Sequence, residues 1–129
     1  MKYMFLLRTD DDGPPEQGTA EAAQMYADYQ LAIQAMAKAG VLLECAPLQG
    51  ASLATTVRVR DGQSMLTDGP AAELKEQVGG YTLVECVDLD EALMYAAMIP
   101  AAATGSVEVR AVIATQAPTT STAAGNLVS

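Results

Sequence analysis

The sequence contains no histidine, and this absence limits the chemistry that the protein can perform near neutral pH. Histidine is the side chain whose ordinary pKa lies closest to neutrality. Without it, general acid–base catalysis needs a carboxyl group whose pKa is raised by burial or by a neighbouring carboxylate. The two cysteines, Cys45 and Cys86, lie in separate apolar runs without a C-x-x-C spacing. We therefore expect no metal site and no bound cofactor, and we predict that both thiols are buried and reduced.

Basic residues are also scarce, since 7 Lys and Arg stand against 16 Asp and Glu and give a formal net charge of −9. Nucleic-acid binding normally rests on clustered Lys and Arg, so no nucleic-acid partner is expected. No apolar run approaches the roughly 20 residues that a membrane helix needs. Residues 1–10 lack a small-residue cleavage site and do not resemble a signal peptide. A cytoplasmic protein of single-domain length that does not bind membranes is therefore expected.

Hydrophobic periodicity divides the chain into strands and helices. The pattern predicts strands over residues 2–8, 41–45, 54–60, 63–67, 81–87 and 106–113, and helices over residues 19–39 and 88–99. Thr19 and Asp88 stand at the N-cap positions, with Glu91 placed to complete a capping box. Residues 1–113 are expected to form the domain. Residues 114–129 are rich in Thr, Ser and Ala and are predicted to form a flexible tail that folding does not require.

The order of these elements is βαβ, a β-hairpin turning at Asp61-Gly62, and a second βαβ. This order predicts an α+β fold, a ferredoxin-like plait with two helices on one face of an antiparallel-containing sheet. The first strand is apolar on both faces, with Tyr3, Phe5 and Leu7 on one and Met4 and Leu6 on the other. Because helices cover one face only, we expect a homodimer that packs through the other sheet face.

Residues 65–81 contain the densest turn and acid–base chemistry of the chain. Asp68-Gly69-Pro70 predicts a turn, since the aspartate can bond its own backbone and Pro70 disfavours helical backbone at Gly69. Glu73 and Glu76 are predicted to share a short helical turn that Gly79-Gly80 ends. The acidic loop over residues 9–18 either lies over a pocket mouth or is a plain connector.

Asp68 is the candidate catalytic residue, because a carboxylate pair with Glu73 or Glu76 would raise a carboxyl pKa. The candidate ligand-binding residues lie around it in the predicted fold: Arg58, Glu73, Lys75, Glu76, Tyr81 and Arg110. A structural alternative stays open, in which Asp68 caps its own turn, Arg58 pairs with Glu108 across strands and residues 73–76 form a solvated face. The run of Asp10, Asp11 and Asp12 lacks the glycine spacing and terminal Glu of a calcium loop.

Residues 1–113 contain a set of short motifs in a characteristic order. They are Thr56-Val57-Arg58, Asp61-Gly62, Thr67-Asp68-Gly69-Pro70, Glu73, Lys75-Glu76, Gly79-Gly80-Tyr81, Leu89-Asp90-Glu91-Ala92 and Gly105-Ser106-Val107-Glu108-Val109-Arg110. This ordered set resembles the YCII-related family in its DGPF-motif branch. The resemblance implies a dimeric α/β barrel of the ferredoxin-like kind. Members of this branch are often described as accompanying extracytoplasmic-function sigma factors, and their biochemical activity is largely undefined.

Two functions follow from these observations. One is the binding or transformation of a small organic molecule in a polar cavity near the Asp68-Gly69-Pro70 turn. The other, which the resemblance implies, is a non-enzymatic regulatory or partner-binding role beside an extracytoplasmic-function sigma factor. The sequence departs from the family pattern at Ala71, where phenylalanine is usual, and at Ala111, where proline is usual. The histidine–aspartate pair of the other YCII branch cannot be carried over, because this chain has no histidine.

Overall fold

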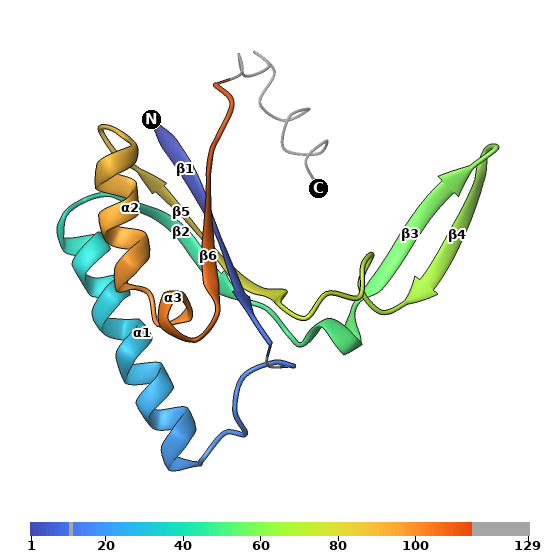
Figure 1. The fold of residues 1–129 in the computed structure, drawn as a ribbon, viewed down its shortest axis with the longest axis horizontal. Helices are drawn as coiled ribbons and strands as arrows, with labels where there is room; N and C mark the ends of the chain where they lie inside the picture. Colours follow the sequence, from blue (N-terminus) through green and yellow to red (C-terminus); the bar gives the residue numbers. More distant parts are fainter. Residues whose placement is uncertain (11, 115–129) are drawn as a thin grey trace, which may run out of the picture.

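The computed structural model describes residues 1–10 and 12–114, and Figure 1 shows their arrangement. The elements in chain order are β1 (Lys2–Thr9), α1 (Ala20–Lys38), β2 (Leu42–Pro47), the 3-10 helix η1 (Ala51–Leu53), β3 (Thr55–Arg60), β4 (Gln63–Asp68), β5 (Gln77–Glu85), α2 (Leu89–Met98), α3 (Ala101–Thr104) and β6 (Ser106–Ala111). The predicted tail lies outside the described residues from residue 115 onward. Among the described helices, none is both long and apolar enough to cross a membrane.

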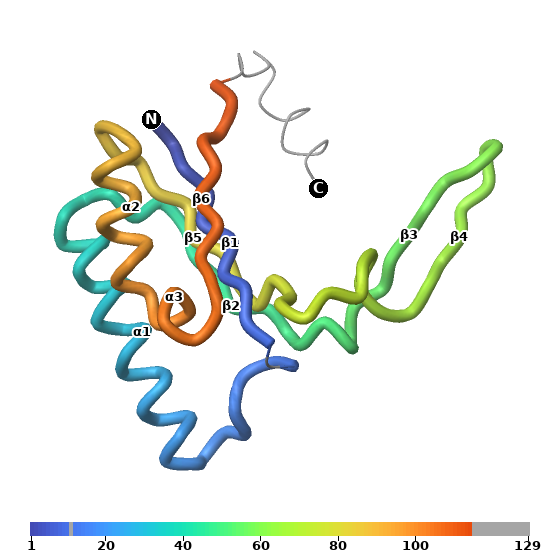
Figure 2. Tube along the Cα trace, viewed as in Figure 1, coloured from blue at the N-terminus to red at the C-terminus, as the bar shows by residue number. Residues whose placement is uncertain are grey.

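Four of the strands form one antiparallel sheet in the order β2-β5-β1-β6. The two long helices, α1 and α2, lie on the same side of this sheet (Figures 1 and 2). Strands β3 and β4 form a separate two-stranded sheet between β2 and β5 in the chain. This arrangement confirms the predicted α+β class with an antiparallel sheet, and it is consistent with the predicted ferredoxin-like plait.

The core lies between the helices and one face of the sheet. Tyr3, Phe5 and Leu7 are buried, and Met36 of α1 packs in the same cluster. The alternate side chains of β1 are only half-buried, because the face of the sheet opposite the helices has no covering element within residues 1–10 and 12–114. We call this surface the outer sheet face; it includes Met4, Leu6, Tyr81, Leu83, Glu108 and Arg110.

Both predicted helix caps are present. The Thr19 hydroxyl accepts a hydrogen bond from the backbone N–H of Ala22 at 3.1 Å. Asp88 accepts one from the N–H of Glu91 at 2.9 Å, while the Glu91 carboxylate accepts the N–H of Val87 at 2.8 Å. The N–H groups of Ala22 and Glu91 are donors that a helix N-terminus leaves open, and the Val87 bond fixes the chain just before the cap, so both helices begin where the sequence predicted.

The hairpin turn is confirmed, whereas the predicted helical turn over residues 73–76 is wrong. Asp61 and Gly62 have positive φ values of 53° and 76°, as a two-residue turn of type I′ requires. Residues 71–76 form bends and irregular backbone without a helical residue, and β5 already begins at Gln77. The Gln77 side-chain amide donates to the carbonyls of Ala72 at 2.8 Å and Leu74 at 3.1 Å. These bonds hold a non-helical loop too short to offset the cost of nucleating a helix.

The glycines predicted to end that helical turn lie instead inside β5. Gly80 pairs with Leu7 on one side and Pro47 on the other. A Cβ atom at Gly80 would lie 3.1 Å from the Ala46 carbonyl oxygen, so glycine permits the close approach of β2.

One further expectation needs correction, namely that both cysteine thiols are buried. Cys86 is buried as predicted, and burial raises the pKa of its thiol. Cys45 is only half-buried.

Candidate functional site

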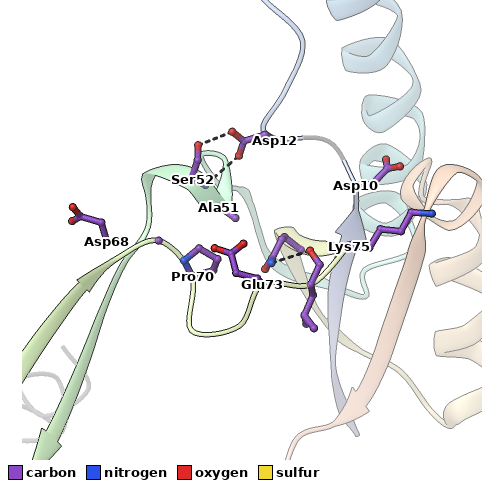
Figure 3. A pocket seen from close by; sticks show the side chains of 11 residues that line it. Asp10, Asp12, Ala51, Ser52, Asp68, Pro70, Glu73 and Lys75 are labelled. Atoms are coloured by element: carbon purple, nitrogen blue, oxygen red, sulfur yellow. Dashed lines mark hydrogen bonds between the residues drawn. The ribbon is translucent and has the colours of Figure 1, made fainter.

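Three segments that are distant in the sequence meet around an open hollow of about 430 Å³ (Figure 3). They are the loop after β1, the 3-10 helix η1, and the segment from the end of β4 to the start of β5. We call this site the acidic hollow, because four carboxylates and one ammonium group line it: Asp10, Asp12, Asp68, Glu73 and Lys75. Its position next to the Asp68-Gly69-Pro70 turn is where the sequence predicted a polar cavity.

Asp12 connects two of the segments that line the acidic hollow, the loop after β1 and the 3-10 helix η1. Its carboxylate accepts hydrogen bonds from the Ser52 backbone N–H at 3.2 Å and from the Ser52 hydroxyl at 2.6 Å. These bonds, the side-chain bond foremost, lower the pKa of Asp12. Gly50 lies against this carboxylate so closely that an added Cβ atom would collide with it. The acidic loop after β1 is therefore docked onto η1 and lines the pocket.

The turn at Asp68-Gly69-Pro70 is present, but the Asp68 side chain does not hold it. Gly69 has a φ of 100°, and its N–H donates to the Ala54 carbonyl at 2.7 Å. The Thr56 hydroxyl donates to the Gly69 carbonyl at 2.7 Å. The Asp68 carboxylate makes no hydrogen bond or ion pair with the described residues. The expectation that Asp68 caps its own turn is therefore wrong.

The candidate residues of the central stretch separate into two groups. Asp68, Glu73 and Lys75 all border the acidic hollow, although Figure 3 shows the Asp68 carboxylate directed away from Glu73. Arg58 lies beside this group and donates to the Ala71 carbonyl at 3.1 Å. Glu76 instead accepts a hydrogen bond from the Ser106 hydroxyl at 2.9 Å, so it ties the loop to β6.

Tyr81 and Arg110 lie on the outer sheet face and do not line the acidic hollow. The Tyr81 hydroxyl donates to the Glu44 carboxylate at 2.5 Å, and this bond raises the pKa of Tyr81. Arg110 forms an ion pair with Glu108 at 3.0 Å.

Glu108 also pairs with a second arginine, and that arginine is not the predicted one. Arg8 of β1 donates to Glu108 at 3.1 Å. The predicted cross-strand pair of Arg58 with Glu108 is wrong, because Arg58 belongs to the separate β3–β4 sheet. The sequence predicted the hairpin correctly, but it did not predict that the hairpin is separate from the four-stranded sheet.

Comparison with known proteins places the chain in a family. The profile of the YCII-related domain matches residues 1–116. The chain belongs to the YCII-related family. An uncharacterized protein of Rhizobium meliloti (strain 1021) is 35% identical over 112 residues, which cover 85% of this chain and 90% of that protein. The family resemblance is therefore confirmed, and assignment to the DGPF-motif branch stays a prediction.

Several residues that line the hollow of this YCII-related protein were absent from the predicted site, among them Asp10, Asp12 and Ser52. The acidic loop gave a signal for the two aspartates, whereas Ser52 becomes part of the site only through the docking of that loop. Within residues 1–10 and 12–114, no group of three or more Asp, Glu or Cys side chains converges closely enough to hold a metal ion. The hollow instead offers separate oxygen acceptors and a negative potential.

Proposed function

We propose that this YCII-related protein binds or transforms a small organic molecule in the acidic hollow. The observation that carries the proposal is the meeting of three separate chain segments around about 430 Å³ of open volume. Ligand sites for small molecules commonly have volumes of about 300–1,000 Å³. The Asp12–Ser52 bonds hold two of the segments together before a ligand arrives. A prearranged wall of this kind lowers the entropy cost of binding.

The charges of the lining favour one class of ligand. Asp10, Asp12, Asp68 and Glu73 outnumber the ammonium group of Lys75. A lining of carboxylates attracts cations and accepts hydrogen bonds from N–H and O–H groups. We therefore propose that the ligand carries an amine or several hydroxyl groups, with Glu73 among the residues that contact it.

Mass spectrometry of the gently purified protein under native conditions tests for a retained small molecule. Calorimetric titration with small amines and polyols then tests Glu73→Gln against the parent. Removing this charge should weaken binding about tenfold, which corresponds to about 1.4 kcal/mol. Glu21→Gln is the matched control, because Glu21 is exposed in the first turn of α1 and lies outside the hollow.

Equal ligand affinity in Glu73→Gln and the parent would contradict the proposed site. A partner-binding protein, the competing class, should tolerate changes in the hollow and depend on exposed surface elsewhere. Conversion of a bound compound, followed by mass spectrometry, separates an enzyme from a binding protein.

We also propose that two copies pack through the outer sheet face and form the dimeric α/β barrel of the DGPF-motif branch. Met4 lies between Leu83 and Arg110 on this face, and Leu6 lies between Tyr81 and Glu108. The apolar members are only half-buried in one chain, so a second copy would remove more of their surface from water. Light scattering at micromolar concentration should give the mass of a dimer, and a stable monomer would contradict this proposal.

A further inference from the structure

A second hollow, of about 380 Å³, lies beside the acidic hollow and shares part of its lining. The residues that border both are Ala51, Pro70 and Gln77. Figure 3 shows Ala51 and Pro70 in the wall of the acidic hollow. Because three residues border both spaces, a ligand held in the acidic hollow lies within reach of the second one.

The lining of the second hollow differs in its chemistry from that of the acidic hollow. Among the described residues that border it, none carries an ionisable side chain. We call it the apolar hollow, because the residues that it does not share include Leu48, Leu53, Ala54 and Val78. Leu53 is 69% exposed and Leu48 is 42% exposed. Both leucines therefore present apolar surface that a bound ligand would remove from water.

Backbone hydrogen bonds hold the walls of the apolar hollow in place. The Leu48 N–H donates to the Gly79 carbonyl at 2.9 Å, which ties the segment after β2 to β5. The Gly69 N–H donates to the Ala54 carbonyl at 2.7 Å, which ties the same segment to the turn after β4. The main chain that carries the two leucines therefore needs no reordering when a ligand binds, and this lowers the entropy cost of binding.

The side chains of the shared border suit an apolar chain. Ala51 and Pro70 are apolar, and the amide nitrogen of Gln77 already donates to the carbonyls of Ala72 at 2.8 Å and Leu74 at 3.1 Å. An apolar chain that lies across this border covers no charged group, whose desolvation would oppose binding. The lining thus changes from carboxylates on one side of the border to apolar side chains on the other.

We propose that the ligand of the acidic hollow is amphipathic, with an ammonium group among the carboxylates and an apolar chain that crosses Ala51 and Pro70 into the apolar hollow. The inference rests on the proposed function of the acidic hollow and extends it, because it assigns a second site and narrows the ligand class to amines with an apolar chain. Carboxylates attract the cation, whereas the chain gains from the apolar area removed from water. The two hollows provide both surroundings along one continuous lining.

NMR titration of the parent protein with primary alkylamines of increasing chain length tests the proposal. Burying one methylene group strengthens binding by up to about fourfold. An open hollow buries only part of the chain, so hexylamine should bind at least about tenfold more tightly than propylamine. An amine whose chain has the same length but is interrupted by ether oxygens should lose most of this gain. The methyl signals of Leu48 and Leu53 should move with hexylamine and stay in place with propylamine.

A double variant, Leu48→Asn with Leu53→Asn, tests whether the chain lies in the apolar hollow. Asparagine has nearly the shape of leucine but removes the apolar contact, and both side chains are exposed, so the fold should be unaffected. The preference for hexylamine over propylamine should disappear. The matched control is Leu31→Asn with Leu93→Asn, whose side chains are 67% and 45% exposed outside both hollows and which should keep the preference of the parent. Urea unfolding checks that both variants are folded.

Glu73→Gln separates the two hollows, because it removes a charge from the acidic hollow and leaves the apolar hollow unchanged. It should weaken the binding of propylamine and hexylamine by the same factor. Equal affinities for the two amines in the parent, or an unchanged preference in the double variant, would overturn the apolar hollow and leave the acidic hollow standing as an amine site. Failure of every amine to bind would overturn both.

Discussion

Asp68 is exposed at the end of β4, and its carboxylate makes no hydrogen bond or ion pair within residues 1–10 and 12–114. The turn that follows is held by Gly69 and Thr56 instead. Both Asp68→Asn and Asp68→Ala should therefore change the free energy of unfolding by less than about 0.5 kcal/mol, as surface substitutions do. Urea unfolding of the two variants checks this.

Measuring the ligand affinity of Asp68→Asn, Asp68→Ala and the parent tests whether Asp68 also has a functional role. If the Asp68 charge contributes to the acidic hollow, Asn and Ala should both weaken binding of a cationic ligand, because both remove the charge. A drop in stability confined to Ala would instead show that the side chain caps its turn in solution.

Asp12 links protonation to the shape of the hollow. Its pKa in the folded protein is lowered by the Ser52 hydrogen bonds, so the docked loop favours the ionised carboxylate. The contribution of these bonds is fully present above the ordinary pKa of 3.8 and is lost as pH falls through the lower folded value. The amide NMR signal of Ser52 should therefore move at acid pH. In Asp12→Asn, which keeps an acceptor oxygen but cannot ionise, the same shift should be absent.

At the scale of elements, the helix starts were readable from sequence because their stabilising contacts are local. The Asp88 cap and the Glu91 side chain lie within four residues of the N–H groups that they accept. Asp88→Ala should lower the free energy of unfolding by about 0.5–2 kcal/mol, whereas Asp88→Ser should keep most of it. Urea denaturation of the three proteins provides the measurement, and equal losses in Ala and Ser would exclude capping as the cause.

The loop before β5 was not readable, because its conformation depends on contacts beyond its own sequence. Glu73 and Glu76 have a spacing compatible with a helix, but Gln77 holds the loop in bends, and strand pairing starts at once. Gly80, which resembles a helix stop, serves close strand packing. The same reason applies to the hollow: residues of the central stretch border it, whereas Ser52 joins it only through the tertiary contact with Asp12.

The β3–β4 hairpin shows a further limit of reasoning from local pattern. Alternation and the Asp61-Gly62 turn predicted a hairpin, and the structure confirms it. Whether such a hairpin joins the main sheet depends on which edge strands are available to it. The hydrophobic periodicity of the hairpin itself does not contain this information. The tertiary fold sends β5 between β1 and β2 and leaves β3 and β4 as a sheet of two.

At the scale of the whole molecule, the outer sheet face and the β3–β4 hairpin both leave apolar side chains in contact with water. If a second copy covers them, folding and association are coupled, and thermal stability depends on protein concentration. The melting temperature of the parent should therefore rise as concentration increases about a hundredfold, by an amount set by mass action.

Leu6→Lys tests this coupling at the centre of the outer sheet face. The side chain is half-buried between Tyr81 and Glu108, so an extended lysine can reach water in one chain but would place a charge in the proposed interface. The variant should sediment as a monomer and should lose the concentration dependence of its melting temperature. Leu31→Lys on the exposed side of α1 adds the same charge away from that face and should retain both properties of the parent. If Leu6→Lys sediments and melts as the parent does, the outer sheet face is not the surface through which two copies pack, because an interface centred on Leu6 would lose apolar contact and would have to bury the added charge.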